Sequence, residues 1–296
     1  MPIPTKTPPS SPLVVGIGEL LWDTFPEGRQ IGGAPANFAY HCQLLGANAV
    51  IVSAVGIDGA GRDLLEALGD RGLNTAQVAT DQAHPTGAVL VDLDLNGVPS
   101  YIIEENAAWD YLDPTSALFD VASQADAVCF GTLAQRSQHS RETILSFLQA
   151  IRPDCLRIFD LNLRQTYYSK RVIADGLHWA TVLKLNAEEL KTIATLLGLE
   201  GSTIELLDTL ATAYGLQAVA LTMGEQGCIL WSDGATIHQE GFDRGPVIDT
   251  VGAGDCFTAV LAMGLLKNEP PQVIAEKANW RAAYVCTQAG AMPLMP

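Results

Sequence analysis

Short apolar segments alternate with amphipathic segments along most of this 296-residue chain, and this alternation limits the possible folds more than any other feature. Apolar runs predict strands at 13–18, 49–55, 127–130, 156–159, 182–185 and 218–221, with an edge hairpin over 228–238. Helices are expected at 34–46, 58–71, 138–150, 170–180, 187–198, 203–214, 253–267 and 271–288. Strands that are apolar throughout are typical of parallel sheets covered on both faces. The sequence therefore predicts an α/β fold with a mostly parallel central sheet and helices on both faces.

One region interrupts the alternation. Residues 86–95 and 99–104 are rich in strand-forming residues, and Asn96-Gly97 between them is a hairpin signal. Two strands without a helix between them predict a small additional β-sheet, to which residues 19–31 could contribute. We expect one domain over 13–296, with lid strands from about 19–31 and 86–110, after a flexible tail over residues 1–12.

The composition of the chain limits its possible binding partners and its cellular compartment. A net charge of -16 argues against nucleic acid or an anionic membrane as a partner. No apolar run is long enough to span a bilayer, and the proline-rich N-terminus lacks the apolar core of a signal peptide. The six cysteines show no metal-binding or disulfide spacing, so we expect reduced thiols in a cytoplasmic protein.

The segment Asp249-Thr250-Val251-Gly252-Ala253-Gly254-Asp255 carries the most chemistry. Its two glycines precede an apolar helix, where free N–H groups and the positive end of the helix dipole attract an anion. Asp255 lies on the first turn and could accept a proton from an attacking hydroxyl. An anion hole beside a carboxylate base is what phosphoryl transfer to an alcohol requires. Taken alone, the motif fits a tight turn and a helix-start acid equally well.

Polar side chains also follow the first and fourth predicted strands. Gly32 to Asn37 opens a helix, and the Asn37 amide suits a polyol, whereas Asp23 upstream fits either a sugar site or a solvated loop. Asp160, Asn162 and Arg164 would share one side of an extended chain. Arg164 is one of few cations available for phosphate, although a surface salt bridge explains it as well.

Two further segments follow later strands. Asn186 and Glu189 fit an N-cap with its capping-box partner, or a pair that faces phosphate and orders water around Mg²⁺. Residues 222–227 hold two glycines and fit either a nucleotide-binding turn or a simple hairpin turn. Two rival phosphate signatures are missing, because no lysine follows a glycine and Gly16-Ile17-Gly18 lacks the third glycine of a dinucleotide fingerprint.

These segments, in this order, resemble the ribokinase-like (phosphofructokinase-B type) family of carbohydrate kinases, from Val14 to about Gly290. The family resemblance implies that Asp255 is the base and that Gly252, Ala253 and Gly254 form the anion hole. It also implies that Asp23, Gly33 and Asn37 bind the sugar. Contacts with Mg²⁺ and phosphate are implied for Glu189, through water, and for Asn186, and contacts with the nucleotide for Thr222, Gly224, Gly227 and Asn279. A K⁺ site is implied at Asp249, Val251 and Gly290. The lid would close over the sugar, and its edge strands could pair in a homodimer.

Segments 18–23, 108–110 and 131–136 are similar to the fructokinase branch, which would bring Gln135 and Arg136 close to the sugar. The resemblance thus implies a kinase that uses ATP and Mg²⁺ to convert fructose to fructose 6-phosphate. Ribose, 2-keto-3-deoxygluconate and nucleosides such as adenosine are the alternative acceptors. A catalytically silent binding or scaffold protein and a nucleotide-dependent dehydrogenase are the alternatives from other classes.

Overall fold

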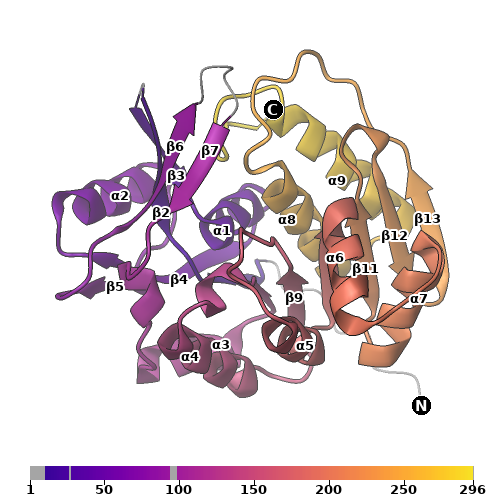
Figure 1. The fold of residues 1–296 in the computed structure, drawn as a ribbon, viewed down its shortest axis with the longest axis horizontal. Coiled ribbons are helices and arrows are strands. Elements are labelled where there is room, and N and C mark those ends of the chain that lie inside the picture. The colour runs from indigo at the N-terminus through magenta and orange to yellow at the C-terminus, as the bar shows by residue number, and fades with distance from the viewer. Residues whose placement is uncertain (1–10, 27, 94–98, 296) are drawn as a thin grey trace.

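The computed structural model describes residues 11–26, 28–93 and 99–295; most of the expected tail and the Asn96-Gly97 turn lie outside these ranges. Within them, the larger sheet has the strand order β13-β12-β11-β10-β9-β8-β1-β4-β5 (Figure 1). Its strands are β1 (Leu13–Ile17), β4 (Asn48–Gly56), β5 (Val78–Asp81), β8 (Ala127–Phe130), β9 (Leu156–Asp160), β10 (Val182–Asn186), β11 (Ala218–Thr222), β12 (Cys228–Ser232) and β13 (Ala235–Gln239). All neighbouring pairs from β11 to β5 are parallel, and β12 and β13 add an antiparallel edge.

Helices cover both faces of this sheet, as the sequence predicted. They are α1 (Ala34–Leu44), α2 (Gly59–Asp70), α3 (Ser116–Gln124), α4 (Gln138–Ala150), α5 (Lys170–Trp179), α6 (Ala187–Leu197), α7 (Thr203–Tyr214), α8 (Ala253–Leu266) and α9 (Pro271–Val285). One core cluster joins α3 to α7 with one face of the strands, and the other joins α1, α2, α8 and α9 with the opposite face. Successive strand residues divide between the two clusters, so the strands are apolar on both sides.

A second, smaller sheet stands to one side of the larger one (Figure 1). It contains β2 (Leu21–Phe25), β3 (Gly28–Gly32), β6 (Gly87–Leu93) and β7 (Pro99–Ile103) in the order β3-β2-β6-β7. The outer pairs are antiparallel, as the hairpin signal between 86–95 and 99–104 predicted for β6 and β7, whereas β2 and β6 are parallel. The parallel pairing arises because β2 follows β1 and β6 follows β5. The strands β1 and β5 are parallel, so their C-terminal ends lie at the same end of the larger sheet.

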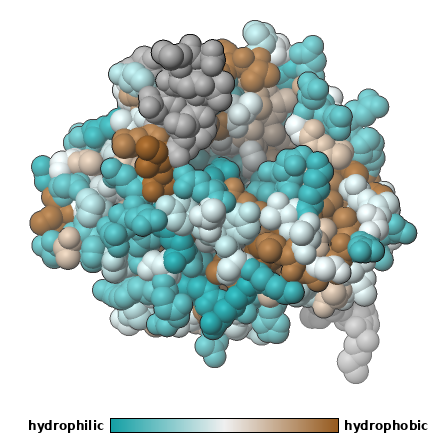
Figure 2. Space-filling view, in the orientation of Figure 1, coloured by the Kyte–Doolittle hydropathy of each residue, from teal (hydrophilic) through white to brown (hydrophobic). Residues whose placement is uncertain are grey.

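One strand and one α-helix were absent from the sequence prediction: the half-exposed strand β5 and helix α3, which begins after the side-chain cap Thr115. All six cysteines are unpaired, as expected. No helix in the described part of the chain combines the length and the apolar composition needed to cross a bilayer. The face drawn in Figure 2 is largely hydrophilic, with separate apolar patches, which suits a chain with 33 acidic residues.

Candidate active site

The first turn of α8 is an open helix N-terminus. Its N-cap is Gly252, with φ of 78°, and no side chain caps the turn. A Cβ built on Gly252 would lie 2.5 Å from Ala291 Cα, so both the backbone conformation and the packing require glycine here. The Ala253 N–H donates to Thr250 O at 3.3 Å, whereas the N–H groups of Gly254 and Asp255 have no capping side chain and remain available to an anion.

Asp255 lies on this turn and meets Asn37 of α1, whose Nδ2 donates to Asp255 Oδ2 at 2.7 Å. Burial, reinforced by the charge of Asp160, raises the pKa of Asp255 to about 6, although Asn37, Lys184 and Arg164 act in the opposite direction. A carboxyl group with this pKa is ionised at neutral pH and still basic enough to take a proton. The structure thus brings together two residues that lie 218 positions apart.

A buried polar network lies directly beneath this turn. Lys184 Nζ of β10 donates to Asp160 Oδ1 of β9 at 3.1 Å, and the Thr258 hydroxyl lies 2.8 Å from Asp160 Oδ2. Burial by itself lowers the pKa of Lys184, but the negative charges of Asp160, Glu189 and Asp255 together more than offset this, so the pKa lies above its usual value. Sequence reasoning missed Lys184; its signal was a lysine inside an otherwise apolar predicted strand.

Two more carboxyl groups lie near Asp255, on the segment that follows β1. Burial raises the pKa of Glu19 to about 7, and the negative charge of Asp255 adds to the effect. Burial also raises the pKa of Asp23, to about 6, with Arg164 opposing it and Asp255 reinforcing it. Gly33, the N-cap of α1 with φ of 110°, packs here, since a Cβ on it would meet Glu19 O at 2.5 Å. Asp23, Gly33, Asn37 and Asp255 therefore belong to one neighbourhood.

The segment after β9 does not stay extended. Asn162 has φ of 40° and Gln165 has φ of 48°, so the chain turns, and the expectation that Asp160, Asn162 and Arg164 share one side was wrong. Asp160 points into the core, whereas Arg164 is exposed and acts electrostatically on Glu19, Asp23 and Asp255. Arg164 is therefore the exposed cation that faces the acidic groups of the site.

Asn186 and Glu189 form a complete capping box at the start of α6. Asn186 Oδ1 accepts from the N–H groups of Glu188 and Glu189, and Glu189 Oε2 accepts from the N–H of Asn186 at 2.7 Å. The other oxygen, Glu189 Oε1, accepts from the N–H of Leu163 at 2.9 Å. Both Glu189 oxygens thus have backbone partners, and the side chain ties the turn after β9 to α6.

Asp249 gathers the residues that the resemblance implied for a monovalent cation. Its Oδ1 accepts from the N–H of Val251 at 2.9 Å, and its Oδ2 accepts from the N–H of Gly290 at 3.1 Å. These bonds join the loop before α8 to the C-terminal loop, close to the Ala291 backbone that packs on Gly252. Backbone N–H groups thus orient both carboxylate oxygens of Asp249.

The residues expected to contact the nucleotide lie in two places: at the end of β11 with the turn that follows it, and in α9. Gly224, with φ of 59°, begins the short 3₁₀ turn η3 (Gly224–Gln226), and Gly227, with φ of 90°, ends it after β11. A Cβ on Gly227 would lie 2.0 Å from Gln239 O, so close packing requires glycine there. The Thr222 hydroxyl faces Leu185 O at 3.4 Å. The Asn279 amide is buried, and its Nδ2 contacts Cys228 Sγ and Ala275 O, both at 2.9 Å.

The short helices η1 (Ala108–Tyr111) and η2 (Leu133–Gln135) meet at the base of the small sheet. Arg136 donates to both carboxylate oxygens of Asp110, at 2.9 and 2.7 Å, and its guanidinium lies over the rings of Trp109 and Tyr167. Gln135 is 2% exposed; its Nε2 donates to Gly131 O, and its Oε1 has no partner among the described residues. Such a buried acceptor suits a ligand hydroxyl.

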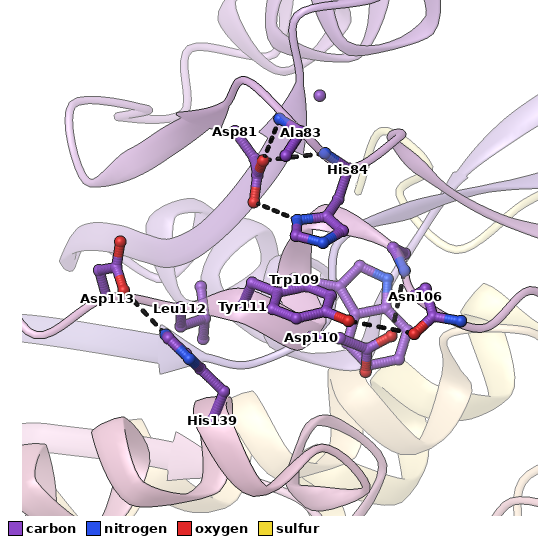
Figure 3. Close-up of polar contacts among 12 residues, drawn as sticks. Asp81, Ala83, His84, Asn106, Trp109, Asp110, Tyr111, Leu112, Asp113 and His139 are labelled. Atoms are coloured by element: carbon purple, nitrogen blue, oxygen red, sulfur yellow. Dashed lines mark hydrogen bonds and ion pairs between the residues drawn. The ribbon is translucent and has the colours of Figure 1, made fainter.

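Figure 3 shows the polar contacts around η1. The Tyr111 ring stacks on His84 with centroids 3.5 Å apart, and the Tyr111 hydroxyl donates to Asn106 Oδ1 at 3.1 Å. His84 Nδ1 lies 2.9 Å from Asp81 Oδ2, and His139 Nε2 lies 2.8 Å from Asp113 Oδ1. Contacts with residues from β5 and α4 therefore hold η1, which follows β7 in the chain.

Similarity to known proteins agrees with this geometry. The chain is 30% identical over 272 residues to a sugar kinase of Pyrococcus horikoshii, covering 86% of this chain and 83% of the relative. It is 29% identical over 300 residues to a fructokinase of Salmonella typhimurium, covering 95% of each. Among solved structures, the uncharacterized sugar kinase of Pyrococcus horikoshii in complex with ATP is 26% identical, with a TM-score of 0.80 over 95% of this chain and 94% of that one.

The fructokinase of Xylella fastidiosa, solved with bound ATP, has a TM-score of 0.82 over 95% of this chain and 94% of that one. At 22% identity this likeness concerns the fold alone, and it confirms the predicted ribokinase-like architecture. Residues 27–296 match the pfkB family carbohydrate kinase description. The chain therefore belongs to the pfkB family of carbohydrate kinases.

Proposed function

We propose that this protein transfers the γ-phosphate of ATP to a hydroxyl of a sugar, with fructose as the acceptor and fructose 6-phosphate as the product. The observation that carries the proposal is the contact between Asn37 and Asp255 at the uncapped start of α8. It places a carboxylate with a raised pKa next to free N–H groups. A base and an anion hole at one helix N-terminus are the two parts that phosphate transfer to an alcohol needs.

In this mechanism Asp255 takes the proton of the sugar hydroxyl while the oxygen of that hydroxyl bonds to the γ-phosphorus. The bond between that phosphorus and the bridging oxygen breaks, and ADP leaves with the electron pair. The N–H groups that follow Gly252 stabilise the charge on the transferring phosphoryl group, and Arg164 supplies a cation on the exposed side. Asn37 orients the Asp255 carboxylate, and its buried Oδ1, which has no partner among the described residues, suits a sugar hydroxyl.

Sugar recognition is assigned to Asp23, Gly33, Asn37 and Gln135. Asp23 and Asn37 would exchange hydrogen bonds with the hydroxyl groups, and Gly33 would let the α1 backbone approach them. The small sheet would cover the bound sugar and exclude water from the transfer step. Fructose is favoured over other acceptors by the full-length similarity to fructokinases, such as the one from Salmonella typhimurium.

The residues present fit Mg²⁺ delivered with the nucleotide. Among the described residues no three His, Cys, Asp or Glu side chains form a metal cluster, and Mg²⁺ held mainly by phosphates and water needs only one or two carboxylates. Glu189, through water, and Asn186 would serve it, and the metal would neutralise charge on the phosphates. Asp249, Val251 and Gly290 would hold K⁺ beside the anion hole, and Thr222, Gly224, Gly227 and Asn279 would border the nucleotide.

The lid also supports a proposal about assembly. Leu90 and Ile102 are paired across β6 and β7, and they are 40% and 56% exposed. Large apolar side chains on a sheet with free edges favour pairing with a second copy. We expect a homodimer through the lid, which sedimentation of the wild type and of an Ile102→Lys variant tests.

A panel of sugars and nucleosides, assayed for ADP release with ATP and Mg²⁺, tests the function. We expect fructose to give the largest kcat/KM, with phosphate on the 6-hydroxyl by NMR. Ribose, 2-keto-3-deoxygluconate or adenosine as the best acceptor would overturn the fructose assignment and leave the kinase chemistry standing. If no sugar or nucleoside in the panel leads to ADP release, a catalytically silent binding protein would be favoured instead.

A further inference from the structure

Lys184 is a charged side chain buried inside the larger sheet. Its side chain is 8% exposed and that of Asp160 is 5% exposed, and the two residues are register partners on adjacent parallel strands. Removing a lysine from water is costly, and a buried ion pair often stabilises a fold no better than an apolar pair of the same volume. Stability alone is therefore a weak explanation for this pair.

The pair is connected to the first turn of α8. The Thr258 hydroxyl lies 2.8 Å from Asp160 Oδ2 and 2.9 Å from Gly254 O, so it can donate to either oxygen. From the other side, Lys184 Nζ would lie only 2.9 Å from a Cβ built on Gly254. Residues on β9, β10 and α8 therefore fix the backbone of Gly254 between a hydroxyl and an ammonium group.

The position of this ammonium group opposes ordinary helix electrostatics. The N-terminus of a helix carries partial positive charge, and a cation beside it is unfavourable while the turn is empty. The unfavourable contact becomes favourable once an anion binds to the turn. The chain has only 17 lysines and arginines against 33 acidic residues, which makes a buried lysine at this place more informative.

We propose that Lys184 is a positioning residue for phosphate transfer, which fixes the first turn of α8 through Asp160 and Thr258 and places its positive charge behind Gly254. The inference rests on the proposed function, because it assigns the transferring phosphoryl group to the other side of that turn. As negative charge develops there, the ammonium group stabilises it through the helix backbone without touching the nucleotide.

The same pair acts on Asp255 from below, with opposite signs. Asp160 disfavours ionisation of Asp255, whereas Lys184 favours it. The other charged and titratable groups that act on Asp255, or on which it acts, are Glu19, Asp23, Cys129, Arg164 and Cys256. These other groups are present in all variants. Neutralising Lys184 should therefore move the low-pH limb of the pH profile of kcat/KM in one direction, and neutralising Asp160 should move it in the opposite direction.

The test uses a double variant, Lys184→Met with Asp160→Asn, which removes both charges and leaves no unpaired buried ion. We expect it to fold, to lose kcat by about 30-fold, and to change KM for sugar and ATP by less than about threefold. Affinity for ADP should be kept, whereas affinity for ADP with aluminium fluoride and sugar, a mimic of the transferring phosphate, should fall by about the same factor as kcat.

Single variants give the second readout. Lys184→Met should move the acid limb to higher pH, and Asp160→Asn should move it to lower pH. The matched control is Arg141→Met with Asp175→Asn, an ion pair between α4 and α5 whose arginine side chain is 5% exposed. This control should change the melting temperature and leave kcat unchanged.

Three results would overturn the inference. The first is wild-type kcat in the double variant. The second is an equal kcat loss in the Arg141–Asp175 control, and the third is a shift of the acid limb in the same direction for both single variants. A wild-type protein that phosphorylates no acceptor would contradict the proposed function itself, and that failure is visible before any variant is compared.

Discussion

Helices α8 and α6 both begin at the edge where the parallel strands end, yet their first turns are completed in different ways. The start of α6 is satisfied internally by the capping box of Asn186 and Glu189. The start of α8 has a glycine N-cap with no side-chain partner, and α1 begins in the same way at Gly33. Asn37 on α1 and Asp255 on α8 join the two open helices. The comparison supports the proposal that the anion binds at the open start of α8, and the capping box of α6 ties that helix to the turn after β9.

At the open start of α8, Asp255→Asn should have the largest effect on kcat. Without a carboxylate to take the proton, we expect kcat to fall by about 10³-fold or more, with the binding of sugar and ATP largely kept. Single-turnover rates and equilibrium binding measure the two parts separately. Turnover near the wild-type rate would remove Asp255 from the role of base.

Gly252→Ala should have the next largest effect, because the new Cβ would meet Ala291 Cα at 2.5 Å and Gly252 has φ of 78°. We expect kcat to fall by about 100-fold as the N–H groups of the turn move away from the phosphate. The control is Gly198→Ala at the end of α6, where φ is 73° and no atom lies within 4 Å of the added Cβ. This control carries the same backbone strain, of about 1 kcal/mol, without the collision. Equal kcat values for the two variants would show that the turn is not an anion hole.

At the capped start of α6, Asn186→Ala should have the smallest effect on the protein. Loss of the cap should lower the free energy of unfolding by about 1 kcal/mol, and Ser202→Ala should do the same at the capping box of α7. If Asn186 also serves the nucleotide phosphates, as we propose, only Asn186→Ala should raise KM for ATP, by several-fold. Thermal unfolding and ATP titrations of both variants decide this, and an unchanged KM would leave Asn186 with a capping role alone.

The sequence predicted what depends on local pattern. Apolar runs located the strands of the larger sheet within a few residues, except the half-exposed β5, and the glycines before an apolar helix indicated the open start of α8. Features that depend on register between distant strands were not predictable in this way. Lys184 gains its meaning only when the sheet places it beside Asp160. The turn at Asn162 was missed because an unusual backbone conformation leaves little trace in a sequence.

The central claim is that Asp255 takes the proton of the acceptor hydroxyl, and the pH dependence of kcat/KM for the sugar tests it most directly. The active form is the carboxylate, and burial raises the pKa of Asp255 to about 6. Activity should therefore be full above about pH 7 and fall about tenfold per pH unit below pH 6. The limb should persist in Asp23→Asn, which removes another nearby group with a pKa of about 6. A flat profile from pH 8 to 5, or a limb that disappears in Asp23→Asn, would contradict the claim.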